Sequence, residues 1–224
     1  MIYTVSISKK LTRTEPKMNQ KISQILEMLH IAEKLKMELR HSWLSNGRQE
    51  SSAEHSWRVC LMLLLLAPET GLKIDVLKAL KMAAIHDLVE ADGYDIPAYE
   101  KHRKEEKKRV ELAAAKKYKK LLNSPAGDEI YELWQEYEKR ESVEAKLVKA
   151  LDSLEVRIQH NESSLDYWID IEYPRSLYAA DDETKIDEFL KEFNEQIKQE
   201  SRDKMIAEGV DLSAIEKQAD ELRG

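Results

Sequence analysis

The placement of glycine and proline constrains the fold of this chain more than any other feature of its sequence. Only 6 glycines and 5 prolines occur among 224 residues, and those in the interior fall between stretches that look helical. Within these stretches apolar residues recur at helical spacing, as Ile22, Ile25 and Leu29 do in the first one. We therefore predict an all-α fold, with no strand apart from an extended piece at 2–7.

The predicted helices follow from these breaks and from capping signals. Ser51, with Glu54 three residues later, is a capping-box signal for a helix over 52–67. That helix is apolar nearly all round, so we expect it to be the buried central helix. Asp75 is a suitable N-cap for the next helix, and Gly93 is a stop signal for its end. The other predicted helices cover 18–40, 101–122, 128–139, 142–160, 183–200 and 211–223.

One helical domain is predicted over residues 18–180, after an irregular leader at 1–17 to which we assign no function. Residues 181–224 carry fourteen acidic and seven basic side chains, and we expect an acidic helical extension that packs on the same domain. An alternative is that this extension serves as a docking or dimerisation surface. Within the domain, Arg40–Gln49 contains the turn signal Asn46-Gly47 and is predicted to be a loop.

The charge and the cysteine content exclude several classes of protein. A net charge of −7 argues against binding to a nucleic-acid polymer, which requires a basic surface. The basic run at 100–120, with ten Lys/Arg against four Glu, is either a solvated helix face or a rim that attracts phosphate. The longest apolar run, Val59–Ala67, is too short to span a bilayer, so we expect no membrane partner. The single Cys60 permits no internal disulfide and indicates a reducing compartment, which we take to be the cytoplasm.

A histidine and a His-Asp doublet lie on two neighbouring predicted helices. His55 is near the start of the helix over 52–67, so its imidazole should point into the protein. His86 and Asp87 are near the end of the next helix. They can bind one ion only if it sits at the flank of that helix, because successive helical residues diverge by about 100°. Imidazole and carboxylate suit Mn²⁺, Fe²⁺, Co²⁺, Ni²⁺ or Zn²⁺, although each motif alone is also compatible with an ordinary core or capping residue.

A second acidic candidate, Asp152, lies on the apolar stripe of a later predicted helix. Its neighbours Leu151 and Leu154 should be buried, and a buried carboxylate usually has a partner such as a metal, an arginine or backbone amides. The alternative is an exposed Asp152 that pairs with Lys149 or Lys146. The pattern alone leaves both interpretations open.

Four further residues supply the polar and aromatic groups that a substrate would need: Glu90, Asp95, Arg40 and Trp43. Glu90 follows His86 by four residues and should share its helix face, where a carboxylate beside a metal can move a proton. Asp95 lies in a turn at the helix exit, suited to meet a substrate hydroxyl, although a lone Asp-x-Pro is more often an ordinary turn. Arg40 offers a planar fork of donors for phosphate, and Trp43 offers an aromatic wall.

Four segments together resemble one family: Glu50–Ser56, Ala84–Glu90, Tyr94–Pro97 and Ala150–Asp152. They are similar to the 5′-deoxynucleotidase-like branch of the HD-domain superfamily of metal-dependent phosphohydrolases, over roughly residues 20–160. The order His, His-Asp, Asp is specific to the superfamily, and the Glu-Ser-x-Ala-Glu-His-Ser and His-Asp-x-x-Glu motifs are specific to this branch. The chain departs from the branch where Tyr94 replaces a glycine before Asp95, and where Trp43 lies three positions after Arg40.

The resemblance implies an HD-domain helical bundle that is usually a homodimer and holds one divalent metal ion. The candidate ions are Mn, Co, Fe, Ni, Zn and Mg. The residues that match the metal ligands are His55, His86, Asp87 and Asp152. The resemblance also implies that Glu90 helps to activate the attacking water, that Asp95 contacts the sugar and that Arg40 faces the phosphate. A tryptophan near Arg40, here Trp43, would disfavour a 2′-hydroxyl.

These expectations define a metal-dependent phosphomonoesterase that hydrolyses (deoxy)nucleoside 5′-monophosphates to nucleoside and phosphate. The residues themselves predict only a carboxylate and imidazole metal site with an adjacent acid, and the nucleotide substrate comes from the resemblance. Two alternatives stay open. One is a phosphodiesterase or nucleotide triphosphohydrolase on the same site, and the other is a helical module that binds a nucleotide or metal without turnover.

Overall fold

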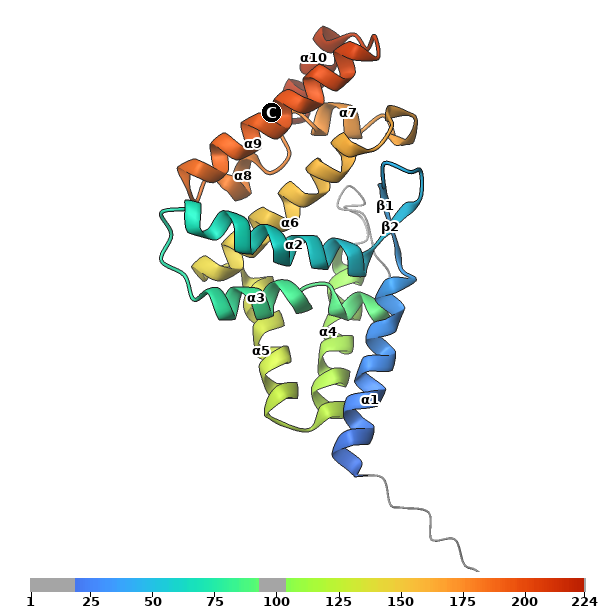
Figure 1. Ribbon diagram of the computed structural model, residues 1–224, viewed down its shortest axis with the longest axis vertical. Coiled ribbons are helices and arrows are strands. Elements are labelled where there is room, and N and C mark those ends of the chain that lie inside the picture. Colours follow the sequence, from blue (N-terminus) through green and yellow to red (C-terminus); the bar gives the residue numbers. More distant parts are fainter. Residues whose placement is uncertain (1–18, 93–103, 224) are drawn as a thin grey trace, which may run out of the picture.

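The computed structural model describes residues 19–92 and 104–223, which form a helical protein with one small hairpin (Figure 1). The α-helices are α1 Gln20–Ala32, α2 Ser52–Leu66, α3 Val76–Ile85, α4 Lys104–Leu122, α5 Pro125–Lys139, α6 Val143–Glu162, α7 Glu172–Arg175, α8 Asp181–Thr184, α9 Glu188–Ala207 and α10 Leu212–Arg223. Short 3₁₀ helices are η1 Glu33–Lys36, η2 Ala67–Glu69, η3 Leu88–Asp92 and η5 Leu165–Tyr167. In Figure 1, α2 and α3 cross the middle of the molecule, α1, α4 and α5 extend to one end, and α9 and α10 lie at the other. The predicted all-α fold class is confirmed.

The starts of α2 and α3 are fixed by the predicted caps. The Ser51 hydroxyl accepts a hydrogen bond from the backbone N–H of Glu54, and the Glu54 carboxylate accepts one from the N–H of Ser51. Arg48 also donates to this carboxylate, and its hydrogen bonds lower the pKa of Glu54 to about 2. The Asp75 side chain accepts from the N–H of Lys78. Both capping predictions are confirmed, and they position the helices that lead to the predicted histidine ligands.

A two-stranded antiparallel hairpin replaces the loop predicted over Arg40–Gln49. Strand β1 covers Leu39–Trp43 and β2 covers Gln49–Ser51, and the pairing is irregular between its two ends. Gly47, at φ +82°, lies in the turn, in a conformation that glycine adopts without strain. The loop prediction was wrong because strands of five and three residues are too short to display a clear alternating pattern.

Two predicted helix ends shift in the structure. Helix α1 ends at Ala32, well before the predicted end of the first helix, and η1 follows it. Helix α3 ends at Ile85 and not close to Gly93, so His86 and Asp87 form the link between α3 and η3. His86 keeps helical dihedral angles (φ −59°, ψ −38°), but its Nε2 lies 3.3 Å from Oδ1 of Asp87, so the tips of the two side chains approach each other in spite of the divergence of successive helical residues. Both can therefore face one point.

Helix α2 is buried on one face only, so the prediction of a helix buried all round was wrong. Val59 and Leu63 have no exposed surface and join the main core with side chains of α3 and α6. Trp57, Leu64 and Leu65 are 65%, 52% and 62% exposed. Both faces of this helix are apolar, so its pattern alone does not reveal which face the rest of the chain covers.

The C-terminal helices pack against α6 and its neighbours. Leu190 and Ile197 of α9 belong to the main core, together with Leu147 and Leu154 of α6. Helix α10 contributes to a smaller cluster around Trp168. No helix in the described part of the chain combines the length and apolar character needed to cross a membrane.

Candidate metal centre

Three of the predicted ligands converge where α2, α6 and the link after α3 meet. One donor atom from each of His55, His86 and Asp152 can be chosen so that all lie within 4.8 Å of one another. His55 comes from α2 and Asp152 from α6, two helices that pack against each other and against α3. Helix packing thus brings residues that are distant in the sequence to one point.

His55 directs its two ring nitrogens to different carboxylates. Its Nε2 lies 3.1 Å from Oδ1 of Asp152 and 3.7 Å from Oδ2 of Asp87. Its Nδ1 contacts Oε2 of Glu155 on the other side of the ring. The imidazole is fully buried. Nε2 is therefore the nitrogen that faces the other predicted ligands.

His86 is oriented by the backbone of α3. Its Nδ1 donates a hydrogen bond to the carbonyl oxygen of Ala83 at 2.8 Å. Its buried Nε2 makes no hydrogen bond within residues 19–92 and 104–223, although Oδ1 of Asp87 lies 3.3 Å away. Burial lowers the pKa of His86 and so favours the neutral imidazole. A neutral ring with a buried nitrogen that lacks a hydrogen bond is suited to a metal ion.

Asp87 and Asp152 keep their negative charge in these surroundings. Burial raises the pKa of Asp152, but the charge of Lys149 and the hydrogen bond from His55 outweigh it and hold the pKa well below its usual value. Burial also raises the pKa of Asp87, but the positive charges of His55 and Arg40 act against it, and the pKa stays below its usual value. Two ionised carboxylates beside two imidazoles form a donor set that attracts a divalent cation.

One oxygen of Asp152 faces the donor set, and the other accepts hydrogen bonds from side chains of α5 and α6. Oδ1 faces His55, while Oδ2 accepts hydrogen bonds from Nζ of Lys149 at 2.7 Å and from the hydroxyl of Tyr137 at 3.0 Å. The ion pair with Lys149, which the sequence left as the alternative to a buried role, is thus present together with the contact to His55. The two donors to Oδ2 fix the carboxylate so that Oδ1 points at the histidine.

The pKa of His55 is raised to about 10 by its carboxylate neighbours. Burial and the charge of Arg40 lower this pKa, but the charge of Glu155 and the hydrogen bonds to Asp152 and Glu155 raise it by more. A cation that binds Nε2 must therefore displace a proton. Cation affinity at this nitrogen should increase with pH below about 10.

Glu90 lies on η3 beside the doublet and is 3% exposed. Its carboxylate accepts hydrogen bonds from the hydroxyl of Ser52 at 3.2 Å and from Nζ of Lys107 at 3.3 Å. Its backbone N–H donates to the carbonyl oxygen of Asp87 at 2.9 Å. The expected shared α-helical face with His86 was wrong, because η3 is a short 3₁₀ helix outside α3. Glu90 is nevertheless held from two sides next to the doublet.

Arg40 extends from β1 toward the doublet. Its NH1 donates to Oδ2 of Asp87 at 3.3 Å, and its Nε lies 3.6 Å from Oε2 of Glu50. Glu50 is 2% exposed, and burial together with the charge of Glu155 raises its pKa to about 7. The guanidinium group is therefore in contact with the predicted ligands and with a buried carboxyl group behind them.

Of the two residues expected near the sugar, Trp43 and Asp95, only Trp43 lies in the described part of the chain. The indole of Trp43 stacks on Tyr167, with ring centres 5.2 Å apart and planes at 3°, and the ring of His41 meets its edge. His41 and Trp43 share one side of β1, while Arg40 lies on the other. Trp43 thus belongs to the packing of the hairpin on η5. Asp95 lies outside the described residues.

Sequence reasoning missed three charged residues behind the donor set: Glu155, Arg58 and Glu50. Glu155 follows Asp152 by three residues, and Arg58 follows His55 by three, so each pair shares a helix face. Reading these two faces together would have predicted a carboxylate and a guanidinium one turn beyond the ligands. Glu50 lies in a strand that was not predicted, and although it opens the Glu-Ser-x-Ala-Glu-His-Ser motif, no role was assigned to it.

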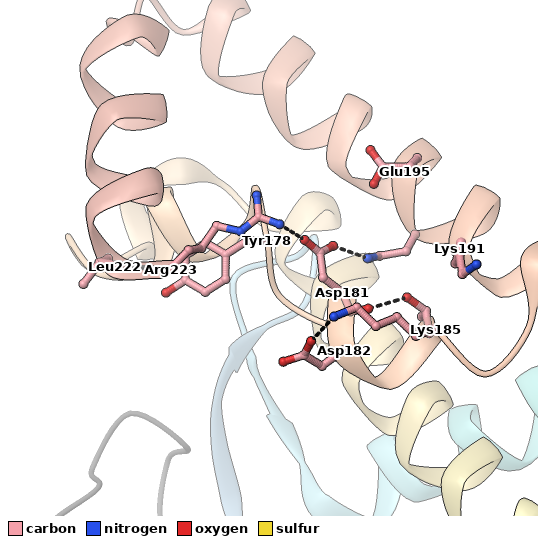
Figure 2. Close-up of a pocket in the computed structure, with 10 residues that line it drawn as sticks. Tyr178, Asp181, Asp182, Lys185, Lys191, Glu195, Leu222 and Arg223 are labelled. Carbon is pink, nitrogen blue, oxygen red and sulfur yellow. Dashed lines mark hydrogen bonds and ion pairs between the residues drawn. The ribbon is translucent and has the colours of Figure 1, made fainter.

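A separate pocket of about 690 Å³ is lined by residues of α8, α9 and α10 and by Tyr178 and Lys185, which flank α8 in the sequence (Figure 2). Its charged side chains pair with one another and with their neighbours: Asp181 contacts Lys198 and Arg223, and Asp182 contacts Lys185. None of the predicted site residues in the described part of the chain lines this pocket. Its ion pairs hold the C-terminal helices together and are distinct from the metal-ligand candidates.

The comparisons with known proteins agree with this geometry. The family model of the HD domain matches residues 32–194. The chain is 37% identical over 148 residues to the 5′-deoxynucleotidase HDDC2 of Dictyostelium discoideum, which covers 63% of this chain and 78% of that protein. It is 34% identical over 140 residues to the 5′-deoxynucleotidase HDDC2 of Homo sapiens, which covers 62% of this chain and 67% of that protein.

A solved structure extends the likeness to most of the helices. A protein from Magnetospirillum magnetotacticum, described as a predicted metal-dependent phosphohydrolase, aligns with a TM-score of 0.64 and 27% sequence identity. The alignment covers 84% of this chain and 96% of that chain. The resemblance first drawn from four short segments is confirmed by a family match over most of the chain. The chain belongs to the HD domain family.

Proposed function

We propose that this chain is a metal-dependent phosphomonoesterase that hydrolyses (deoxy)nucleoside 5′-monophosphates to nucleoside and phosphate. The relatives from Dictyostelium discoideum and Homo sapiens are named 5′-deoxynucleotidases, which supports this substrate class. The observation that carries the proposal is the convergence of His55, His86 and Asp152 next to the buried Glu90. A cation-binding set beside a proton acceptor is the combination that metal-assisted hydrolysis of a phosphate ester requires.

The proposed metal ligands are His55, His86, Asp87 and Asp152. Two imidazoles and two carboxylates suit one divalent ion out of Mn, Co, Fe, Ni, Zn and Mg, and imidazole favours the transition metals among these. Such an ion supplies a bound water of lowered pKa and offsets the charge on the phosphate. The buried Nε2 of His86, which makes no hydrogen bond to a described residue, supports this assignment.

Glu90 is the proposed proton acceptor. Ser52 and Lys107 hold its carboxylate at 3.2 Å and 3.3 Å, so the group is oriented before a substrate arrives. A carboxylate in this position takes a proton from the attacking water and can deliver it to the sugar oxygen that leaves. Glutamine at position 90 would keep the shape and remove this function.

Arg40 is the proposed phosphate-binding residue. Its guanidinium lies 3.3 Å from Oδ2 of Asp87, so a phosphate bound next to Asp87 falls within its reach. The buried Glu50 contacts Nε and restrains the guanidinium plane. Asp95 stays the proposed sugar contact on the basis of the resemblance. Trp43 stays the proposed aromatic residue that disfavours a 2′-hydroxyl, on the basis of the resemblance, while its ring stacks on Tyr167.

A homodimer is the proposed assembly. Helices α1 and α2 expose a set of large apolar side chains: Ile22, Ile25, Leu26, Leu29, Trp57, Leu61, Leu64 and Leu65. On each helix the spacing of three or four residues puts these side chains on one face, and an apolar face exposed in this way is typical of a surface that a second subunit covers. Replacing Leu64 and Leu65 by Glu should yield monomers in analytical ultracentrifugation, whereas a dimer that persists would contradict this interface.

We further propose that residues 18–180 form the catalytic unit and that 181–224 pack on it, as the place of Leu190 in the main core supports. The cytoplasm is the proposed location. It is a reducing compartment, in which the half-buried Cys60 thiol would stay reduced.

The proposed function is tested by metal analysis of the purified protein and a phosphate-release screen over nucleoside mono-, di-, tri- and cyclic phosphates. We expect one divalent ion per chain and release of inorganic phosphate from the 5′-monophosphates. Hydrolysis confined to cyclic nucleotides or triphosphates would replace the proposal by a phosphodiesterase or triphosphohydrolase. Nucleotide binding without turnover under every metal tested would favour a binding module.

A further inference from the structure

Helices α2 and α6 face each other, and on two successive turns a basic side chain of α2 contacts an acidic side chain of α6. The first turn pairs His55 of α2 with Asp152 of α6, whose Nε2 and Oδ1 lie 3.1 Å apart. The next turn pairs Arg58 with Glu155, whose Nε and Oε1 lie 2.9 Å apart. The spacing is three residues on both helices, so the second pair follows the first along the same two faces.

Glu155 connects these two turns. It is fully buried, its Oε2 contacts Nδ1 of His55, and its Oε1 pairs with Arg58. Arg58 also reaches outward to Glu162, whose carboxylate lies 2.7 Å from NH1 and is 47% exposed. Contacts therefore run without interruption from a surface carboxylate to the imidazole at the donor set.

We propose that Glu155 is a positioning residue for the metal site, which accepts a hydrogen bond from Nδ1–H of His55 and so keeps Nε2 as the metal-binding nitrogen. This inference rests on the proposed role of His55 as a ligand. A carboxylate that accepts from the second nitrogen of a ligating histidine fixes its tautomer and ring orientation and increases the basicity of the ligating nitrogen. Glu155 acts through His55 and touches neither the metal nor the substrate.

The second histidine has a different support. His86 donates from Nδ1 to the backbone carbonyl of Ala83 at 2.8 Å, which fixes the ring but brings no negative charge. His55, in contrast, depends on a side chain from another helix, and that side chain carries a full charge. The loss of Glu155 should therefore affect one ligand and leave the orientation of the other intact.

A direct role for Glu155 as a ligand of a second ion fits the surroundings less well. Glu50, His55 and Glu155 do form another compact group of donor atoms. However, the guanidinium groups of Arg40 and Arg58 lie 3.6 Å and 2.9 Å from the two carboxylates. Two fixed positive charges at these distances repel a further cation. The carboxylates of Glu50 and Glu155 are therefore assigned the role of orienting neighbouring side chains and not that of binding a second ion.

The test is the metal affinity of Glu155→Gln, measured by titrating metal-free protein with Co²⁺ and following the visible absorption of the bound ion. Glutamine keeps the size and an acceptor oxygen but removes the charge, and we expect the affinity to fall about 10-fold to 100-fold. The matched control is Glu162→Gln, which removes the outer partner of Arg58 and should retain the wild-type affinity. Wild-type affinity in Glu155→Gln, or an equal loss in the control, overturns the proposal.

Circular dichroism and thermal unfolding of the metal-free variants separate positioning from folding. We expect the helical signal of Glu155→Gln to match that of the wild type. If this variant fails to fold because Arg58 loses its buried partner, the double variant Arg58→Gln/Glu155→Gln removes both charges and takes its place. It should show the same loss of Co²⁺ affinity, and wild-type affinity in the double variant overturns the proposal.

Asp152→Ala distinguishes failure of this inference from failure of the proposed function. If Asp152→Ala binds Co²⁺ as the wild type does, the ion does not bind at His55 and the metal assignment itself is wrong. If Asp152→Ala loses Co²⁺ while Glu155→Gln binds it normally, only the role of Glu155 is refuted.

Discussion

Two aspartates, Asp152 and Asp181, each gather three polar partners in different parts of the molecule. The partners of Asp152 are His55, Lys149 and Tyr137. The partners of Asp181 are Lys198, Arg223 and Asn194, and Figure 2 shows this residue among the side chains of the C-terminal pocket. The two carboxylates are 13% and 20% exposed, so neither burial nor the number of contacts distinguishes them.

The difference lies in which groups surround each carboxylate, because each has one buried polar atom nearby without a hydrogen bond in the described residues: Nε2 of His86 at Asp152 and Oδ1 of Asn194 at Asp181. Next to Asp152, the buried Nε2 of His86 makes no hydrogen bond to any residue in the described ranges. At Asp181, the positive charges of Lys198 and Arg223 tie α8 to α9 and α10. The surroundings of Asp152 thus offer an imidazole nitrogen that can bind a metal ion, whereas the clamp at Asp181 balances its carboxylate with two cations.

The largest expected effect is the loss of metal and activity in Asp152→Ala. Removing a ligand should abolish stoichiometric binding of the divalent ion and lower phosphate release at least about a thousandfold, because the metal supplies several kcal/mol of transition-state stabilisation. Metal analysis and the phosphate assay measure both. Asp181→Ala should keep its metal and its activity. If Asp152→Ala retains the wild-type metal content, Asp152 is not a metal ligand and does not differ from Asp181 in this respect.

A smaller effect is expected for Glu90→Gln. The variant should keep its metal, while kcat falls about a hundredfold or more because the proton acceptor is lost. Glu111→Gln is the matched control, since Lys107 contacts Glu111 as well as Glu90. Steady-state kinetics with a nucleoside monophosphate measures both variants. Equal losses in the two would show that the charge balance of Lys107, and not proton transfer, is responsible.

Asp181→Ala should act on stability and leave the metal site unchanged. Lys198 is 5% exposed and would lose its partner Asp181, and the link to Arg223 in α10 would also be lost. We expect the free energy of unfolding to fall by about 2–3 kcal/mol in urea denaturation. An unchanged free energy of unfolding would mean that these contacts do not clamp the C-terminal helices.

Glu111→Gln should produce the smallest effect, a change in the free energy of unfolding that is seen at neutral and higher pH but not at acidic pH. Burial raises the pKa of Glu111 from its usual 4.5 to about 7. Below pH 4.5 the group is protonated whether the chain is folded or unfolded, and its contribution to stability is lost as the pH rises toward 7. The variant should therefore match the wild type at pH 4 and be more stable by about 1–2 kcal/mol at pH 8, less than the full shift would give because some water contact remains. If the variant and the wild type were equally stable at pH 8, the ionised Glu111 carboxylate would not destabilise the folded protein, and the prediction would be wrong.

The elements with local signals could be predicted from the sequence. The Ser51–Glu54 capping box and the Asp75 cap act between residues three positions apart, so the sequence alone contains what they need. The HD-domain assignment rested on short motifs and is confirmed by the family match. The meeting of His55 with Asp152 was expected from the resemblance, while the pattern of α6 alone left Asp152 undecided between metal and Lys149.

The features that depend on how helices pack could not be predicted. Glu155 reaches His55 only because α2 and α6 lie in one particular rotation relative to each other, which neither helical pattern encodes. The hairpin was missed because its strands are very short, and the stacking of Trp43 on Tyr167 depends on that hairpin. The exposed face of α2 was missed because both of its faces are apolar.

The hydrogen bond from His86 to the carbonyl of Ala83 gives the two histidines different mutational tolerance. A backbone carbonyl is present whatever side chain occupies position 83, so a substitution there changes volume in a fully buried place but leaves the acceptor. The acceptor for His55 exists only while position 155 is Glu or a residue that can replace it. A random mutation is therefore more often able to remove the acceptor of His55 than that of His86. Loss of ligand orientation during evolution should accordingly begin with the histidine held between α2 and α6.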